Sequence, residues 1–173
     1  MTVEYRPEQI QAVRQLRNGS ILAGGVGSGK TLTSLAWYLT SVCNAASFKK
    51  GGSLAKKVVK GSPTLYVITT AKKRDSLEWE EEAARLGLST DPACSFTGSS
   101  IVVDSWNNIG KYSDREHAVF FFDEQRASGS GRWVKEFLKI TKKNTWIMLS
   151  ATPGDVWLDY LPVFMAHGFY RTR

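Results

Sequence analysis

The chain has 173 residues, of which 42% are hydrophobic and 23% charged, a composition typical of one compact globular domain rather than of a disordered or fibrous chain. Its net charge of +7 favours a polyanionic partner. No apolar run approaches the roughly 18 residues that a membrane-spanning helix needs, and the polar start MTVEYRPEQI lacks the apolar region of a secretory signal. We therefore expect no membrane association. Cys43 and Cys94 can form at most one disulfide, so we expect a reducing, cytoplasmic setting.

Short apolar runs alternate with helical patterns along the chain. Helices are predicted at Pro7–Arg17, from about Lys30 to Asn44, and near Lys73 to Leu86, the first with a proline in its opening turn. Five runs have the uninterrupted apolar character of strands covered on both faces of a sheet: Ile21–Ala23, Leu65–Thr70, Ile101–Asp104, Ala118–Phe122 and Trp146–Leu149. This alternation predicts a three-layer α/β domain with a mostly parallel central sheet.

Residues 47–62 interrupt this order. The segment carries five lysines, no acidic residue and a Gly-Gly pair, which predicts an exposed, mobile loop between a helix and a strand. Two roles stay open for it: a solvated linker, or an arm that contacts phosphates.

A glycine-rich turn between the first predicted strand and the second predicted helix carries the strongest motif. It fits the P-loop pattern G-x-x-x-x-G-K-[ST] without a mismatch and consists of Gly24, Gly25, Val26, Gly27, Ser28, Gly29, Lys30 and Thr31. Glycines let several backbone N–H groups point into one concavity, and the helix N-terminus adds positive potential. We expect Lys30 to reach the β- and γ-phosphates of a nucleotide and Thr31 to hold Mg²⁺.

Two carboxylates follow the fourth predicted strand. The run Val119–Phe122 is apolar and is followed directly by Asp123 and Glu124. Parallel strands bind ligands at their carboxyl ends, so Asp123 is expected to hold the Mg²⁺ shell, as a Walker B aspartate does. Glu124 is placed to take a proton from an attacking water. The predicted catalytic residues are therefore Lys30, Asp123 and Glu124.

The fifth predicted strand ends in the sequence Ser150-Ala151-Thr152. The P-loop, the Asp-Glu pair and Ser-Ala-Thr, in this order, resemble the first motor domain of superfamily 2 helicases and translocases. The nearest resemblance is to the remodeller-type (Snf2-like) branch, particularly its small versions encoded by bacteriophages. It covers nearly the whole chain and implies that residues 1–173 form one RecA-like domain of a DNA-dependent ATPase, a helicase or translocase, in the host cytoplasm if a phage encodes it.

Further positions gain roles from this resemblance. The segment Tyr5–Gln9 is similar to the family's N-terminal motif, whose glutamine reads adenine, which implies that Gln9 selects ATP through its amide. The segment Thr69–Lys73, followed by Trp79 and Glu80, is similar to the family's motif Ia, which touches the nucleic-acid backbone. The resemblance implies that Thr70, Lys72 and Lys73 contact DNA. Ser105 and Trp106 follow the third predicted strand, where the family has another segment that touches nucleic acid. The resemblance favours double-stranded DNA as the partner, while the residues alone do not separate DNA from RNA.

The chain departs from the family pattern at one position. The Asp-Glu box continues as Gln125-Arg126, where the family has Ala-His or Ala-Asp. The fourth residue of this box usually links the state of the ATP site to Ser-Ala-Thr. The resemblance therefore implies that Arg126, Ser150, Ala151 and Thr152 couple ATP binding to movement.

The family also has a second RecA-like domain, which supplies an arginine finger and half of the DNA track. Nothing in this sequence matches that domain. We expect it in cis on a longer chain or in trans on a partner. Residues 1–173 alone should hydrolyse ATP poorly, because an arginine finger raises the rate of hydrolysis about a thousandfold or more in related P-loop enzymes.

Two other classes of function stay open. The chain could be a nucleotide-gated binding module that recruits a partner without turning over ATP. It could also be a small P-loop phosphotransferase, although Ser-Ala-Thr after the fifth predicted strand and the lack of a recognisable lid argue against that class. Full ATP affinity with no hydrolysis, even in the presence of DNA and excess partner, would favour the first class, and phosphate transfer to a small acceptor would favour the second.

Overall fold

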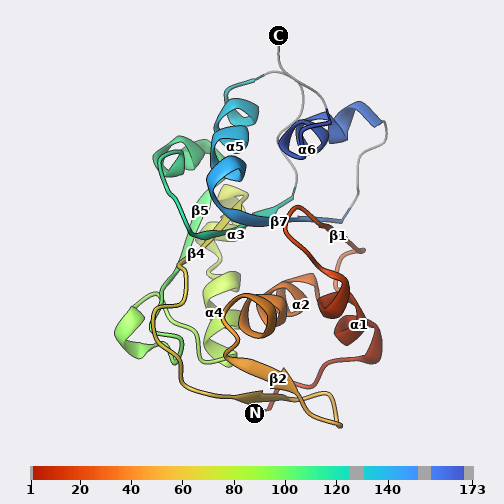
Figure 1. The fold of residues 1–173 in the computed structure, drawn as a ribbon, viewed down its shortest axis with the longest axis vertical. Coiled ribbons are helices and arrows are strands. Elements are labelled where there is room, and N and C mark those ends of the chain that lie inside the picture. The colour runs from red at the N-terminus through yellow and green to blue at the C-terminus, as the bar shows by residue number, and fades with distance from the viewer. Residues whose placement is uncertain (1, 125–130, 152–156, 170–173) are drawn as a thin grey trace.

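A computed structural model describes residues 2–124, 131–151 and 157–169 of the chain. Its centre is a five-stranded sheet in the order β1-β7-β6-β4-β5, in which every pair of neighbours is parallel (Figure 1). The strands are β1 (Ile21–Ala23), β4 (Leu65–Thr69), β5 (Ile101–Ser105), β6 (Val119–Asp123) and β7 (Thr145–Ser150). All five strand predictions are confirmed, and with them the α/β class.

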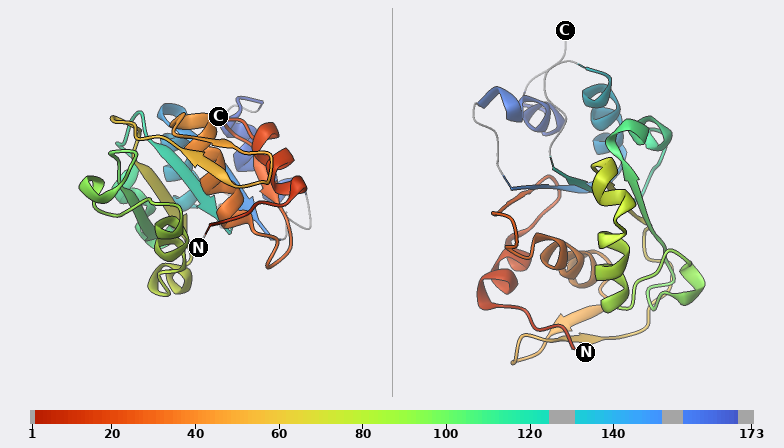
Figure 2. Two further views of the ribbon diagram at one scale, coloured as in Figure 1. Left: turned by 90° about the horizontal axis from the view of Figure 1, so that it is seen from below. Right: turned by 180° about the vertical axis from the view of Figure 1, so that it is seen from behind.

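Helices cover both faces of this sheet, so the domain has three layers (Figures 1 and 2). One face carries α1 (Pro7–Gln15), α2 (Lys30–Trp37) and α4 (Glu78–Arg85), and the other carries η3 (Trp106–Tyr112), α5 (Arg132–Lys143) and α6 (Leu161–Ala166). Side chains alternate between the faces along a strand. In β6, Phe121 accordingly packs in the core under α2 and α4, and Phe120 and Phe122 pack in the core under α5. This central strand is buried throughout.

Several helices differ from the predictions. The second predicted helix is α-helical only to Trp37 and continues as a π-helical segment, η1 (Tyr38–Val42). The third is divided into α3 (Ala71–Asp75) and α4, because Leu77 has a positive φ of 58°. Helices α5 and α6 were not predicted. Two short 3₁₀ segments, η2 (Pro92–Cys94) and η4 (Trp157–Tyr160), complete the described elements.

The lysine-rich segment is not the loop that we expected. It forms an antiparallel hairpin of β2 (Ala46–Phe48) and β3 (Leu54–Lys56). The turn of the hairpin is attached to the start of the chain, because the backbone N–H of Tyr5 donates to the carbonyl of Gly52 at 3.0 Å. Gly52 has a φ of 82°, and a Cβ there would lie 2.6 Å from the carbonyl oxygen of Tyr5, so this turn requires glycine.

Among the described helices, none combines the length and the apolar character needed to cross a membrane.

Candidate nucleotide-binding site

The predicted P-loop and the predicted carboxylates meet in one cleft, which we call the P-loop cleft. It has a volume of about 350 Å³ and lies where the carboxyl ends of β1, β6 and β7 meet. Its lining combines the P-loop with carboxylates and one further lysine: Val26, Gly27, Ser28, Gly29, Lys30, Thr31, Leu32, Lys73, Glu78, Glu82, Asp123, Glu124 and Ala151. The cleft is not the largest hollow of the surface, so its chemistry rather than its size makes it the candidate site.

The glycines of the P-loop give the loop its shape. Gly27 and Gly29 have φ values of 76° and 80°, a region that L side chains rarely adopt. Gly29 is the N-cap of α2, so the helix begins at Lys30 and directs its first N–H groups toward the loop. A loop that exposes N–H groups at a helix N-terminus has the local structure that binds phosphate.

The ammonium of Lys30 folds back onto the loop. Its Nζ donates to the carbonyls of Gly24 and Gly25, the latter at 2.9 Å, and lies 3.5 Å from the hydroxyl of Ser28. Burial lowers the pKa of Lys30, and the nearby charges of Asp123 and Glu124 oppose that shift only in part. Lys30 therefore contacts carbonyl oxygens at the place where a phosphate would offer stronger acceptors.

Asp123 is buried, with 3% of its surface exposed, and three side chains hold its carboxylate. The hydroxyl of Thr69, the ammonium of Lys73 and the indole N–H of Trp79 all donate to the same oxygen, Oδ2, at 2.9, 3.2 and 3.1 Å. The indole of Trp106 donates to the backbone carbonyl of Asp123 at 3.1 Å. Donors from β4, α3, α4 and η3 thus fix this aspartate at the end of β6.

Glu124 follows in a strained backbone conformation. Its φ of 56° is positive, and its N–H donates to the carbonyl of Leu149 in β7 at 3.0 Å. Positive φ in a non-glycine residue costs energy and is common at functional sites. This turn places the carboxylate of Glu124 in the P-loop cleft.

Lys73 joins the two carboxylates. Its Nζ lies 3.2 Å from Oδ2 of Asp123 and 3.1 Å from Oε1 of Glu124. Burial lowers the pKa of Lys73, but Asp123 and Glu124 outweigh burial and hold the pKa above its ordinary value. We expected Lys73 to contact DNA. In this structure its charge instead lies in the P-loop cleft.

Gln9 lies beside the P-loop rather than in its cleft. Its amide NH₂ lies 3.3 Å from the hydroxyl of Thr33 and 3.4 Å from the carbonyl of Gly29. Its Oε1 accepts from the backbone N–H of Arg6 at 3.0 Å, which caps α1. The Arg6 guanidinium donates to the carbonyl of Ser28 at 2.9 Å. The segment Tyr5–Gln9 therefore supports the back of the P-loop.

The remaining residues predicted to contact DNA lie in different environments. Thr70 is the N-cap of α3, and Lys72 is exposed beside it. Ser105 and Trp106 are each only 2% exposed, because Ser105 contacts Arg74 and the Trp106 ring packs against Phe122 and Trp133. The side chains of Ser105 and Trp106 are thus not accessible for the DNA contact that was predicted for them.

The predicted coupling residues are described only in part. The carbonyl of Ser150 accepts from the N–H of Gly24 at 3.1 Å, which ties the end of β7 to the P-loop, and Ala151 lines the P-loop cleft. Arg126 and Thr152 lie outside the described residues.

Sequence reasoning missed how Asp123 is held. Trp79 and Thr69 were assigned to a region that touches nucleic acid, because position in a motif was the only signal. Their contacts with Asp123 span 44 and 54 residues along the chain. No periodicity within a segment predicts such pairs. The helical spacing of Trp79, Ala83 and Leu86, which are all buried, could have indicated that Trp79 faces the core, where an indole N–H usually finds a partner.

Comparisons with known proteins identify the fold. No family model matches the chain, and no curated protein matches it. Among solved structures, the Sulfolobus solfataricus SWI2/SNF2 ATPase core in complex with dsDNA superposes with a TM-score of 0.67 and 18% identity over 96% of this chain. The Pyrococcus furiosus Hef helicase domain superposes with a TM-score of 0.63 and 18% identity over 97%.

The fold is RecA-like. The superposed regions amount to 36% and 39% of the two solved chains, so this chain spans little more than a third of their lengths. At 18% identity the likeness concerns the RecA-like fold alone.

Proposed function

We propose that this domain is the first, ATP-binding motor domain of a superfamily 2, remodeller-type DNA-dependent helicase or translocase. One observation carries the proposal. The P-loop, with Lys30 and Thr31, lines the same cleft as the carboxylates of Asp123 and Glu124, although the P-loop lies far from these carboxylates in the sequence. The cytoplasmic setting and the bacteriophage origin rest on the sequence alone and stay predictions.

The donor atoms in the P-loop cleft fit Mg²⁺. Asp123 offers a carboxylate and Thr31 a hydroxyl, and Mg²⁺ prefers hard oxygen ligands, with phosphates and waters completing its shell. When bound with ATP, Mg²⁺ would neutralise phosphate charge and orient the phosphate chain. Among the described residues, no three His, Cys, Asp or Glu side chains gather as a metal site, so the nucleotide itself would have to supply further ligands.

The residues of this chain supply the other parts of the chemistry. We expect Lys30 to exchange the carbonyls of Gly24 and Gly25 for phosphate oxygens, since charged acceptors form stronger hydrogen bonds. Glu124 would orient the attacking water and accept its proton. Gln9 would exchange its long hydrogen bonds to Thr33 and Gly29 for the edge of adenine.

Nucleic acid is the partner that the charge and the fold favour. The net charge of +7 suits a phosphate backbone, and one structural neighbour, the Sulfolobus solfataricus ATPase core, was solved in complex with dsDNA. A second RecA-like domain, in cis or in trans, would complete the motor, as in the family that the motifs resemble.

Steady-state ATP hydrolysis with and without duplex DNA tests the proposal, with Glu124→Gln as the matched variant. We expect ATP binding by both proteins and slow turnover by residues 1–173. Any turnover should fall by roughly 10²- to 10⁴-fold in Glu124→Gln, the usual contribution of a general base. Equal turnover by the two proteins above the blank would contradict the role of Glu124. Transfer of phosphate to a small acceptor would favour a phosphotransferase instead.

A further inference from the structure

Two adjoining hollows follow the β2–β3 hairpin on the outside of α1. One, of about 860 Å³, includes Arg14, Lys56 and Lys57 in its lining. The other, of about 620 Å³, includes Arg14, Lys49 and Lys50. Both also include Phe48, and no aspartate or glutamate lines either of them. We call this continuous surface, with its five cations, the basic groove.

The five residues are exposed, but the ammonium of Lys56 lies 5.6 Å from the centre of the Phe96 ring, which lines neither hollow. The charges that the groove presents are therefore mainly those of Arg14, Lys49, Lys50 and Lys57. None of the ion pairs among the described residues involves any of the five. No acidic side chain lines the groove, although the exposed Glu4 bridges to Ser53 at the turn of the hairpin. Positive charges that outnumber their acidic neighbours repel one another, and a polyanion would offset that repulsion. The groove therefore differs from an ordinary mixed surface, on which opposite charges alternate.

The groove is also held in a defined shape. The hairpin pairs in register from Ala46–Lys56 to Phe48–Leu54. Its Phe48 ring packs edge-on against Tyr5 at 5.4 Å between ring centroids, and the Tyr5 N–H holds the turn at Gly52. Because these contacts fix the backbone, binding would require ordering of little more than lysine side chains.

The basic groove lies near the P-loop cleft but is separate from it. Figures 1 and 2 show the hairpin on the side of α1 and α2 that faces away from the sheet. Tyr5 contacts the turn of the hairpin, and the next residue, Arg6, contacts the P-loop at Ser28. A polymer that contacts the edge of the P-loop cleft can therefore extend onto the hairpin.

We propose that the basic groove binds the sugar–phosphate backbone of duplex DNA, as a contact surface additional to the motif segments at the carboxyl edge of the sheet. This inference rests on the proposed function for its choice of polyanion. Lysines act as point charges, and phosphate contacts position a protein without reading sequence. Binding at the groove is thus independent of base sequence and strongly dependent on salt.

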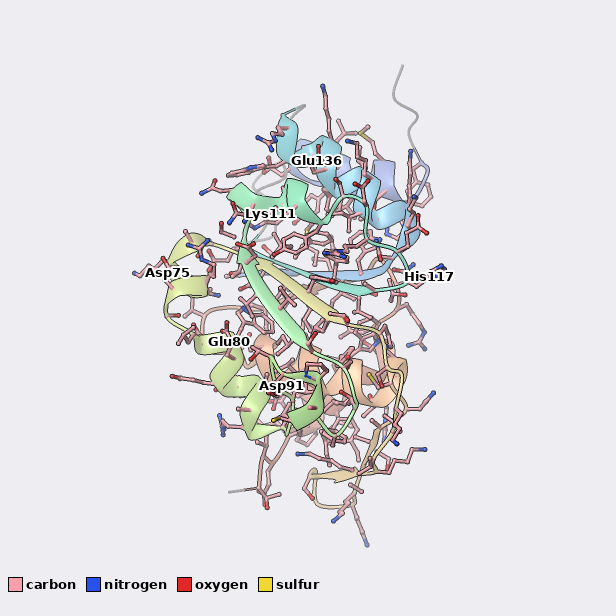
Figure 3. All side chains as sticks on the ribbon, turned by 90° about the vertical axis from the view of Figure 1, so that its left-hand side faces the viewer. Asp75, Glu80, Asp91, Lys111, His117 and Glu136 are labelled. Carbon is pink, nitrogen blue, oxygen red and sulfur yellow. The ribbon has the colours of Figure 1, made fainter. Side chains whose placement is uncertain are left out.

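The test is fluorescence anisotropy of a labelled duplex of mixed sequence, titrated at several KCl concentrations. The variant is Lys49→Gln/Lys50→Gln/Lys57→Gln. The matched control, Lys111→Gln/Lys135→Gln/Lys142→Gln, removes the same charge from exposed lysines on the other side of the sheet, where Figure 3 shows Lys111. Circular dichroism and thermal melting confirm that both variants fold.

We expect the groove variant to lose about tenfold or more in DNA affinity. Its slope of log K against log [KCl] should fall by about 2.7, because each duplex phosphate contact contributes about 0.9. The control variant should stay within about twofold of the unmodified chain. Equal losses in both variants, or unchanged binding in the groove variant, would overturn the proposal, and so would binding to anionic lipid vesicles without binding to DNA.

Titration of ATP into the same proteins separates the two proposals. The groove variant should bind ATP as tightly as the unmodified chain, since none of the three lysines lines the P-loop cleft. Loss of DNA binding in this variant with ATP binding intact supports the groove. If the unmodified chain binds DNA through the groove but binds no ATP, the proposed function fails and the groove stands.

Discussion

The P-loop cleft and the basic groove both depend on lysines, but the two sets of lysines have different surroundings. In the cleft, Lys73 lies within 3.2 Å of two carboxylates, and Asp123 receives hydrogen bonds from three further elements. In the groove, the lysines are exposed and no acidic side chain lines the surface. In the cleft, each charged side chain thus has specific partners, whereas in the groove several exposed positive charges act together.

This difference predicts how each region responds to substitution. A buried donor that loses its acceptor stays unsatisfied, and the fold then loses the full desolvation free energy of that donor. An exposed charge is screened by water and salt, and its loss is spread over its neighbours. Single changes in the cleft should therefore have large local effects, whereas the groove should respond mainly to combined changes.

Asp123→Ala should have the largest effect on stability. The buried donors of Thr69 and Trp79 would lose their acceptor, which costs about 2–4 kcal/mol in the free energy of unfolding. Urea unfolding measures this. Asp75→Ala is the control, because Asp75 is exposed at the outer end of α3 (Figure 3) and should tolerate the change. Similar losses in the two variants would contradict the contrast between buried pairs and exposed charges.

Trp79→Phe should have the next largest effect. Both Trp79 and Trp37 are buried, both pack against Phe121, and each donates its indole N–H. Either Trp→Phe change should therefore cost about 1–3 kcal/mol. Only Trp79→Phe should weaken Mg·ATP binding, by several-fold, because Trp37 donates to the carbonyl of Leu16 instead of to Asp123. Calorimetric titration of both variants decides the point, and equal ATP affinities would refute it.

Lys73→Met should reveal the charge balance of the cleft. Without the ammonium, Asp123 and Glu124 would repel each other, so we expect a loss of about 1 kcal/mol in cation-free buffer. Mn²⁺ or Mg²⁺ without nucleotide should restore the melting temperature and bind several-fold more tightly than to the unmodified chain. Lys72→Met, one residue away and exposed, is the control. In an electron paramagnetic resonance titration, the six-line signal of free Mn²⁺ should fall more with Lys73→Met than with the unmodified chain, and equal signals with the two proteins would contradict this expectation.

The smallest effect concerns pH. Burial raises the pKa of Asp104, but hydrogen bonds from Tyr112, Asn108 and the N–H of Ser105 hold it below the ordinary value of 3.8. A lowered pKa stabilises the fold above the unfolded-state value, and that contribution is lost as pH falls through the folded-state pKa. Tyr112→Phe should therefore cost up to about 1 kcal/mol at pH 6 and less near pH 3. A constant difference in urea unfolding across this range would oppose the prediction.

The sequence was sufficient for the parts that depend on local pattern. The five strands were predicted from apolar runs. The P-loop was predicted from its spaced glycines, two of which, Gly27 and Gly29, have the positive φ that favours glycine. The contacts that Lys73 and Trp106 make with Asp123 could not be predicted, because the direction of a side chain depends on elements that are distant in sequence. The β2–β3 hairpin was missed because its anchor, Tyr5, lies more than forty residues earlier, and lysine content alone suggested a solvated loop.

The most direct test of the central claim is calorimetric titration of Mg²⁺ with a non-hydrolysable ATP analogue into the unmodified chain and into Lys30→Ala. We expect one saturable site in the unmodified chain and at least about tenfold weaker binding in the variant, since Lys30 supplies a charge-assisted contact to phosphate. Equal affinity in both proteins, or no binding by the unmodified chain at millimolar nucleotide, would contradict the assignment of the P-loop cleft.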